Sequence, residues 1–345
     1  MSAAWLHLAG PSGNTCRTVT SFVKRYQWQR NHFIPPSFGS LSKAIQFFII
    51  GDKPNIKTEG GIPMTRLMTL VLALVLSLSL CVPAVAEQTV PTGVEDGVLT
   101  IAMECGYAPY NWIQGDDSNG AVPVANVPGQ YANGYDVMIA KKLCEANNWQ
   151  LEILQSDWDS LVPGVMTGTI DAVIAGQSMT EERMEQVDFA GPYFYASIVC
   201  VTKEGGKFAE AKGLSDLAGG TCTAQIATIW YDSCLPQIKG ASIMTAAETA
   251  PAMLMALETD TVDYICTDMP TALGACAAYP GMKILDFSQG DDDFQVSEGE
   301  INIGISMMKG NTYLKDAMNN VLSQMTADDF NALMAQAIEV QPMNQ

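Results

Sequence analysis

Residues 158–194 read WDSLVPGVMTGTIDAVIAGQSMTEERMEQVDFAGPYF, and their hydrophobic pattern alternates between two kinds of element. Apolar side chains at helical spacing predict a helix at the start of this stretch: Trp158, Leu161, Val162 and Val165. The run TIDAVIAG (169–176) then predicts a buried strand that ends in glycine, and a second helix is expected to begin near Thr180. A buried strand between two helices is the repeating unit of a parallel α/β sheet.

The same alternation extends over most of the chain. Strands are predicted at 98–103, 150–155, 196–205, 221–226, 261–268, 282–287 and 301–310, and helices at 134–149, 227–235, 246–257, 269–279, 311–325 and 326–338. This order predicts an α/β fold with a mostly parallel sheet that carries helices on its faces. The turn-rich stretch 116–134 and the acidic stretch 288–300 are expected to be surface loops.

The candidate site follows from the strand ends. In sheets of this kind, ligands bind beyond the carboxyl ends of the strands. Four clusters of polar or aromatic residues lie at the ends of predicted strands or directly after them, at 104–110, 176–178, 225–228 and 267–268. None of these clusters has the composition of a hydrophobic core, so we expect them to contain the functional residues.

The charge of the chain changes abruptly near residue 86. Residues 1–86 contain eight Lys/Arg and two Asp/Glu; the rest contains ten and 35, which gives it a formal net charge of −25. The run MTRLMTLVLALVLSLSLCVPAVAE (64–87) has a basic start, an apolar middle and an Ala-x-Ala cleavage site. We interpret 64–86 as a secretory signal peptide rather than a membrane anchor, and 1–63 as a non-native upstream extension.

The protein is therefore expected to be exported, to the periplasm or to the outer face of the cell membrane. A lipid anchor at Cys81 is the alternative to free secretion. The Ala-x-Ala site fits better, because Leu80 stands directly before Cys81, where the lipoprotein peptidase prefers a small residue.

Composition excludes several classes of function. Both histidines, His7 and His32, precede residue 87, so the exported body lacks the commonest general base and metal ligand. Its seven cysteines show no Cys-x-x-Cys spacing, which argues against zinc; they are either partly paired or buried as small hydrophobic residues. The acids at 291–293 match no EF-hand spacing, and a net charge of −25 argues against nucleic acid. We expect no metal and no cofactor.

Arg183 is the basic residue whose sequence surroundings suggest a function. One interpretation is a surface salt bridge with the neighbouring acids, which would contribute little. The other is a carboxylate cradle. Gly176 ends a strand, Ser178 offers a hydroxyl group, a helix starts near Thr180, and the planar fork of arginine donates two parallel hydrogen bonds to a carboxylate. The residues alone leave both interpretations open.

The body of the chain resembles the family 3 solute-binding proteins of amino-acid ABC importers. The motifs that carry the resemblance are YAPYNW (107–112), NGYDVMIAKKL (133–143), the block 158–194 and AQIATIWYD (224–232), and it extends over 95–340. Met138 replaces a second acid of the family pattern, and Ala227 replaces its usual glycine.

The resemblance implies a two-lobed periplasmic-binding-protein-like fold (type II), with the lobes joined by two crossover strands near 196–203 and 293–303. Lobe 1 would combine 95–196 with 303–345, and lobe 2 would be 203–293.

The resemblance also implies roles for single residues. Arg183 matches the arginine that binds the ligand α-carboxylate, and Ser178 and the backbone at Gly176 match its helpers in lobe 1. Thr228 matches a hydroxyl and N–H donor from lobe 2. Asp268 matches the acid that holds the α-ammonium group. No residue is assigned a catalytic role.

The resemblance gives three further residues to the ligand side chain. Tyr107 and Trp158 match two aromatic walls, although each could instead belong to the core. Glu104 matches an acid at the side-chain end of the pocket, which favours Lys, Arg, His or Gln as ligand. An ordinary exposed acid is the alternative for Glu104.

The expected function is capture of a polar or basic L-amino acid by lobe closure, and its delivery to the membrane permease by a monomeric protein. One alternative is an exported enzyme resembling cyclohexadienyl dehydratases, for which Glu104 is the only candidate general acid. Another is the sensor module of a receptor. The complete carboxylate-plus-ammonium clamp and the lack of histidine in the body favour binding.

Overall fold

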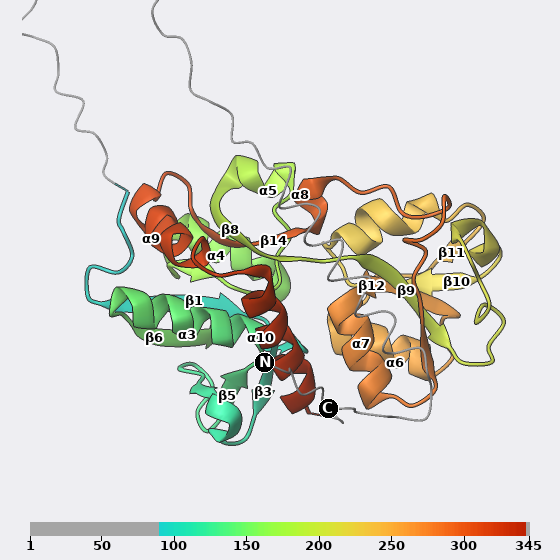
Figure 1. Cartoon of the computed structure of the whole chain (residues 1–345), viewed down its shortest axis with the longest axis horizontal. Coiled ribbons are helices and arrows are strands. Elements are labelled where there is room, and N and C mark those ends of the chain that lie inside the picture. The colour runs from blue at the N-terminus through green and yellow to red at the C-terminus, as the bar shows by residue number, and fades with distance from the viewer. Residues whose placement is uncertain (1–89, 343–345) are drawn as a thin grey trace, which may run out of the picture. The chain divides into compact units, whose positions relative to one another are not determined.

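The computed structural model describes residues 90–342, and its main strands form two five-stranded sheets (Figure 1). In the first sheet the order is β6-β1-β7-β14-β8. β1 runs parallel to β6 and β7, whereas β14 runs antiparallel to β7 and β8. The strands are β1 (Val98–Met103), β6 (Gln150–Gln155), β7 (Ala172–Val173), β8 (Val187–Tyr195) and β14 (Asn302–Met308).

The second sheet repeats this arrangement, with the order β11-β10-β12-β9-β13. β10 runs parallel to β11 and β12, and β9 runs antiparallel to β12 and β13. The strands are β9 (Ile198–Lys203), β10 (Thr221–Thr223), β11 (Ser242–Ile243), β12 (Tyr264–Asp268) and β13 (Met282–Leu285).

The chain passes between the two sheets twice. β8 ends at Tyr195 in the first sheet, and β9 begins at Ile198 in the second. After β13 the chain returns through the short helix α8 (Glu298–Ile301) into β14 (Figure 1). The prediction of two α/β lobes joined by two crossover strands is confirmed. We call the part built on the first sheet the first lobe, and the part built on the second sheet the second lobe.

Helices pack on both sheets, as the alternating pattern predicted. The first lobe contains α3 (Tyr135–Asn147), α4 (Leu161–Thr167), α5 (Glu181–Gln186), α9 (Thr312–Leu322) and α10 (Ala327–Val340); the second contains α6 (Ala250–Glu258) and α7 (Met269–Ala278). α3 buries the apolar face that its spacing indicated, including Val137, Ile139 and Leu143. α10 begins after Thr326, whose hydroxyl group accepts from the N–H of Asp329 in a capping box.

Two central strands are buried at their carboxyl ends. All five residues of β12 are buried, and so are the last three of β1. A strand covered on both faces reads as a continuous apolar run, so a polar residue at its carboxyl end is conspicuous. Asp268 ends β12, and Glu104 directly follows β1.

Two local predictions were wrong. The stretch 116–134 is not only loop, because it contributes to a small sheet of order β2-β3-β5-β4, made of β2 (Gly106–Tyr107), β3 (Asn111–Gln114), β4 (Val122–Pro123) and β5 (Tyr131–Asn133). The predicted helix 227–235 is a single π-helical segment, η4 (Trp230–Cys234), continued by a 3₁₀ turn, η5 (Leu235–Gln237). Short strands and irregular turns carry little periodicity, which is why the pattern missed them.

Some predictions fall on residues that the structure does not describe. The upstream extension, the signal peptide and Cys81 all lie before residue 90. Within 90–342, no helix is long and apolar enough to cross a membrane. The seven cysteines of this range are free thiols, and six of them are buried. In the acidic stretch, Asp292 accepts hydrogen bonds from the N–H and hydroxyl groups of Ser215, which gives it a local structural role.

Candidate ligand-binding site

The predicted site residues meet where the two lobes face each other. A cavity of about 20 Å³ is lined by Tyr107, Trp158, Gly176, Ser178, Arg183, Gln225, Thr228, Ile229 and Trp230. Six of the eight predicted residues are in this lining. The other two, Glu104 and Asp268, lie directly behind it, because their carboxylates accept hydrogen bonds from Gln225 and Tyr107. The structure therefore brings all eight together.

Arg183 projects from the short helix α5 toward the second lobe. Its Nη1 donates to the carbonyl oxygen of Ser178 at 2.9 Å, and its Nη2 donates to the carbonyl oxygen of Ala227 at 3.0 Å. Within residues 90–342 its guanidinium group forms no ion pair, so the salt-bridge interpretation finds no support. Burial lowers the pKa of Arg183 to about 10, against the opposing effect of Glu182 and Asp232, and the group stays charged at neutral pH.

Trp158 lies beside this arginine rather than in the core. The guanidinium carbon of Arg183 is 5.5 Å from the centre of the Trp158 ring, within the range of a cation–π contact. The indole Nε1 donates to the carbonyl oxygen of Ala227 at 3.2 Å, so Trp158 and Arg183 share one acceptor in the second lobe. Trp158 is half-buried, which fits a cavity wall better than a core residue.

Ala227 takes the left-handed conformation that glycine usually supplies. Its φ angle is +54°, so this alanine adopts a backbone conformation that glycine takes without steric cost. The next residue, Thr228, lines the cavity, and its hydroxyl group donates to the carbonyl oxygen of Gln225 at 2.7 Å.

Gly176 provides space for an aromatic ring. Its φ angle is +64°, and a Cβ atom here would lie 2.5 Å from the ring of Tyr107. Tyr107 in turn stacks on Tyr110 with their centres 4.7 Å apart. The N–H of Gly176 donates to the hydroxyl group of Tyr193 at 3.0 Å. The close approach expected at Gly176 is therefore made by Tyr107, and the N–H is already bonded.

Glu104 is a buried acid, 8% exposed, and not an exposed one. Its two carboxylate oxygens accept from Nε2 of Gln225 at 3.2 and 3.0 Å. Burial raises the pKa of Glu104, and the charge of Asp157 raises it further, whereas the Gln225 hydrogen bonds lower it. Sequence reasoning placed Gln225 in a strand-end cluster but gave it no role; its partner is 121 residues away in the chain.

Asp268 is a buried acid at the end of a central strand of the second lobe, as Glu104 is in the first lobe. Its Oδ1 accepts from the N–H of Thr271 at 2.9 Å and caps α7, while its Oδ2 accepts from the hydroxyl group of Tyr107 at 2.5 Å. The side chain is 1% exposed, and burial raises its pKa. Arg183 and Asp268, the two residues expected to bind opposite ends of a zwitterion, thus lie on different lobes.

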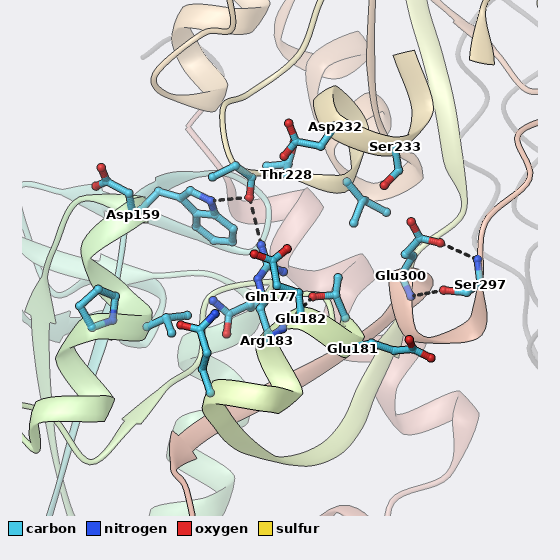
Figure 2. A pocket seen from close by; sticks show the side chains of 17 residues that line it. Asp159, Gln177, Glu181, Glu182, Arg183, Thr228, Asp232, Ser233, Ser297 and Glu300 are labelled. Carbon is cyan, nitrogen blue, oxygen red and sulfur yellow. Dashed lines mark hydrogen bonds between the residues drawn. The ribbon is translucent and has the colours of Figure 1, made fainter. Parts of the chain in front are cut away.

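A larger pocket of about 680 Å³ opens beside Arg183 (Figure 2). Figure 2 shows Asp232 and Ser233 on one side of it, with Arg183, Glu182 and Gln177 on the other. Five carboxylate side chains line it: Asp159, Glu181, Glu182, Asp232 and Glu300. It shares Trp158, Arg183, Thr228 and Ile229 with the small cavity, so the clamp lies next to a strongly acidic opening.

This geometry agrees with the relationship of the chain to known proteins. Residues 99–338 match the model of the bacterial extracellular solute-binding proteins, family 3, and the chain belongs to that family. A probable histidine-binding protein of Campylobacter jejuni is 26% identical over 194 residues, 56% of this chain and 68% of that protein. An L-cystine-binding protein of Escherichia coli is 23% identical over 75% of this chain and 89% of that protein.

Solved structures of the family show the same fold. An amino acid ABC transporter substrate-binding protein from Streptococcus pneumoniae, bound to L-arginine, has a TM-score of 0.59 at 22% identity and covers 71% of this chain and 95% of its own. An ancestral amino acid-binding protein described as a precursor of cyclohexadienyl dehydratase has a TM-score of 0.58 at 24% identity, with 71% and 97% covered. The predicted two-lobed type II fold is therefore confirmed.

Proposed function

We propose that this chain is the extracytoplasmic substrate-binding component of an amino-acid ABC importer. It captures a polar or basic L-amino acid as its lobes close and delivers it to the membrane permease. The observation that carries this proposal is the placement of Arg183 and Asp268 on opposite lobes at one cavity. An α-carboxylate would replace the Ala227 carbonyl group at Arg183, and an α-ammonium group would replace the Tyr107 hydroxyl group at Asp268.

The ligand class follows from Glu104. Its buried carboxylate is bonded to the neutral amide of Gln225, and within residues 90–342 no Lys or Arg forms an ion pair with it. A cationic side chain placed between Tyr107 and Trp158 would supply the missing charge. Two of the similar proteins are named for histidine and arginine, which fits this ligand class. Another is named for L-cystine, so a ligand with a neutral side chain should be tested beside them.

The test is calorimetric titration of the purified protein with the twenty amino acids and L-cystine. The protein is first unfolded and refolded, so that any ligand carried through purification is removed. Micromolar or tighter binding of a basic or polar amino acid, lost in Arg183→Ala, is the expected result. If none of these compounds bound, the proposal would be wrong.

One observation favours a second candidate function. Glu104 is buried with a raised pKa, and a carboxyl group that retains a proton is what an exported dehydratase would need as general acid. We nevertheless propose binding without catalysis, because both ends of the zwitterion clamp are present. Incubation with arogenate and prephenate separates the two, and turnover that disappears in Glu104→Gln would establish the enzyme.

The remaining parts of the proposal concern the protein as a whole. We propose that it acts outside the cytoplasm as a monomer, and that its partner is a membrane permease. We propose lobe boundaries of 95–196 with 303–345 and of 203–293. Limited proteolysis, which cuts between compact units, is the measurement for the boundaries, and light scattering is the measurement for the monomer.

A further inference from the structure

One fully buried carboxylate of the first lobe has none of the roles described above. Asp136, in the first turn of α3, is the acid of the motif NGYDVMIAKKL and has 0% exposure. Its Oδ1 accepts from the hydroxyl group of Tyr193 at 2.6 Å, and its Oδ2 accepts from the side-chain amide of Asn111 at 2.8 Å. No Lys or Arg in residues 90–342 forms an ion pair with it.

The first arm of this network ends beside Glu104. Oδ1 of Asn111 accepts from the backbone N–H of Cys105 at 2.8 Å. Cys105 has a φ angle of +58°, a left-handed conformation that is unfavourable for a residue with a side chain. The turn that aims Glu104 into the site is therefore held by the Asn111 side chain.

The second arm ends at Gly176, two residues before Ser178. The hydroxyl group of Tyr193 donates to Asp136 and accepts from the backbone N–H of Gly176. Gly176 is also left-handed, and it contacts the ring of Tyr107. β1 and β7 are neighbouring parallel strands, so Cys105 and Gly176 lie at the same edge of the first sheet. Each of these left-handed turns is linked, through one intervening side chain, to the same carboxylate.

We infer that Asp136 is a positioning residue for the ligand site, because it fixes the two strand-end turns that present Glu104, Gly176 and Ser178. This inference rests on the proposed function only in the assumption that the positioned residues bind an amino acid. The positioning itself is a statement about two backbone N–H groups and can be measured without a ligand.

The hydrogen-bond inventory makes Asp136→Asn a sharp test. The network has four donors: the N–H groups of Cys105 and Gly176, the Asn111 amide and the Tyr193 hydroxyl. Four oxygen atoms accept them. Asparagine at 136 replaces one acceptor by a donor, so no rotation of the side chains satisfies every group, and a buried unsatisfied donor is costly.

The structure also supplies a rescue variant. In the double variant Asn111→Asp with Asp136→Asn, the amide at 136 would donate to the carboxylate at 111, and all four hydrogen bonds could form in the original places. Tyr193→Phe removes only the arm to Gly176. The matched control is Asp171→Asn, which changes a carboxylate that accepts from the N–H of Thr100 in the first half of β1.

The first measurement is amide hydrogen exchange of Cys105 and Gly176 by NMR in the ligand-free protein. We expect both amides to exchange about tenfold or more faster in Asp136→Asn, at wild-type rates in the double variant, and faster only at Gly176 in Tyr193→Phe. Unchanged exchange in both single variants would overturn the inference. If Asp136→Asn does not fold, Tyr193→Phe and the double variant still decide it.

The second measurement is affinity for L-arginine and L-histidine by calorimetry. We expect about tenfold or greater weakening in Asp136→Asn, recovery in the double variant and no change in Asp171→Asn. Equal weakening in Asp171→Asn would show a general loss of stability and would overturn the positioning role. If the wild-type protein bound no amino acid, the proposed function would fail, and the exchange rates would still test Asp136.

Discussion

The two lobes contribute to one cavity with different kinds of groups. The first lobe presents a cation and two aromatic rings, from Arg183, Tyr107 and Trp158. The second lobe presents mainly acceptors, namely the carbonyl oxygen of Ala227 and the carboxylate of Asp268. Each group of the first lobe donates to an acceptor of the second, so the hydrogen-bonding groups of the two surfaces are complementary.

The lobes also hold their groups in place by different means. In the first lobe, the strand-end turns at Cys105 and Gly176 depend on a buried carboxylate reached through side chains. In the second, Asp268 is fixed by capping α7, which requires only the local backbone. The comparison indicates that left-handed turns at strand ends are held by a buried polar network, whereas a residue at a helix N-terminus is positioned by the helix itself.

The largest loss of ligand affinity is expected when Arg183 of the first lobe is replaced. Arg183→Ala removes the cation of the first lobe, and we expect affinity for the bound amino acid to fall about 100-fold or more. Arg183→Lys keeps the charge but loses the planar fork, so we expect an intermediate loss. Calorimetry measures both variants, and equal affinity of Arg183→Lys and wild type would contradict two-point recognition of the carboxylate.

A smaller loss is expected for the anion of the second lobe. Asp268→Asn removes the charge but retains a side chain that caps helices well, so the melting temperature should change little. We expect affinity to fall about tenfold to 100-fold, because a charge-assisted hydrogen bond to the ammonium group is lost. Asp263→Asn, near the start of the same strand, is the control. A large fall in melting temperature would show that the Asp268 carboxylate acts mainly in the stability of the fold and not in ligand binding.

Glu104 should affect selectivity more than overall binding. In Glu104→Gln we expect L-arginine to bind about tenfold more weakly and L-glutamine to bind almost unchanged, because only the cation needs the carboxylate charge. Competition between the two ligands measures the ratio. Equal weakening of both ligands would show that Glu104 maintains the structure of the site and does not determine its selectivity.

The same residue predicts a pH dependence. Burial raises the pKa of Glu104, and only the ionised form attracts a cation. Affinity for L-arginine should therefore be highest above this raised pKa and should fall as the pH is lowered through it. The ratio of L-arginine to L-glutamine affinity isolates Glu104, because both ligands use Asp268. A ratio that does not change with pH would contradict the assignment.

The smallest effect is expected at Trp158. Trp158→Phe retains an aromatic wall but removes the Nε1 hydrogen bond to the carbonyl oxygen of Ala227, a bond that links the two lobes. We expect affinity to change about twofold to fivefold, because one neutral hydrogen bond contributes little net free energy. Fluorescence cannot be compared between these variants, so calorimetry is again the measurement. A loss as large as that of Arg183→Ala would show that closure depends on this bond.

Sequence reasoning located the site because the rule behind it is topological. Carboxyl ends of parallel strands share one edge of a sheet, so polar residues after predicted strands must lie close together. This rule predicted that Glu104, Gly176, Thr228 and Asp268 lie close together, and the structure brings them to one cavity, even though the predicted strand at 169–176 extends well beyond β7. The helix start near Thr180 was also correct, since its hydroxyl group caps α5.

The sequence by itself determined the two-lobed architecture and the strand ends at which the site is formed, because hydrophobic periodicity and the resemblance to family motifs are properties of neighbouring residues. Tertiary structure alone decided which groups are partners. Tyr107 meets Asp268 across 161 residues, Glu104 meets Gln225 across 121, and Asp136 meets Tyr193 across 57. Such pairs depend on how the two lobes come together and on which polar groups become buried and therefore need a hydrogen-bond partner. Neither leaves a periodic signal in the sequence.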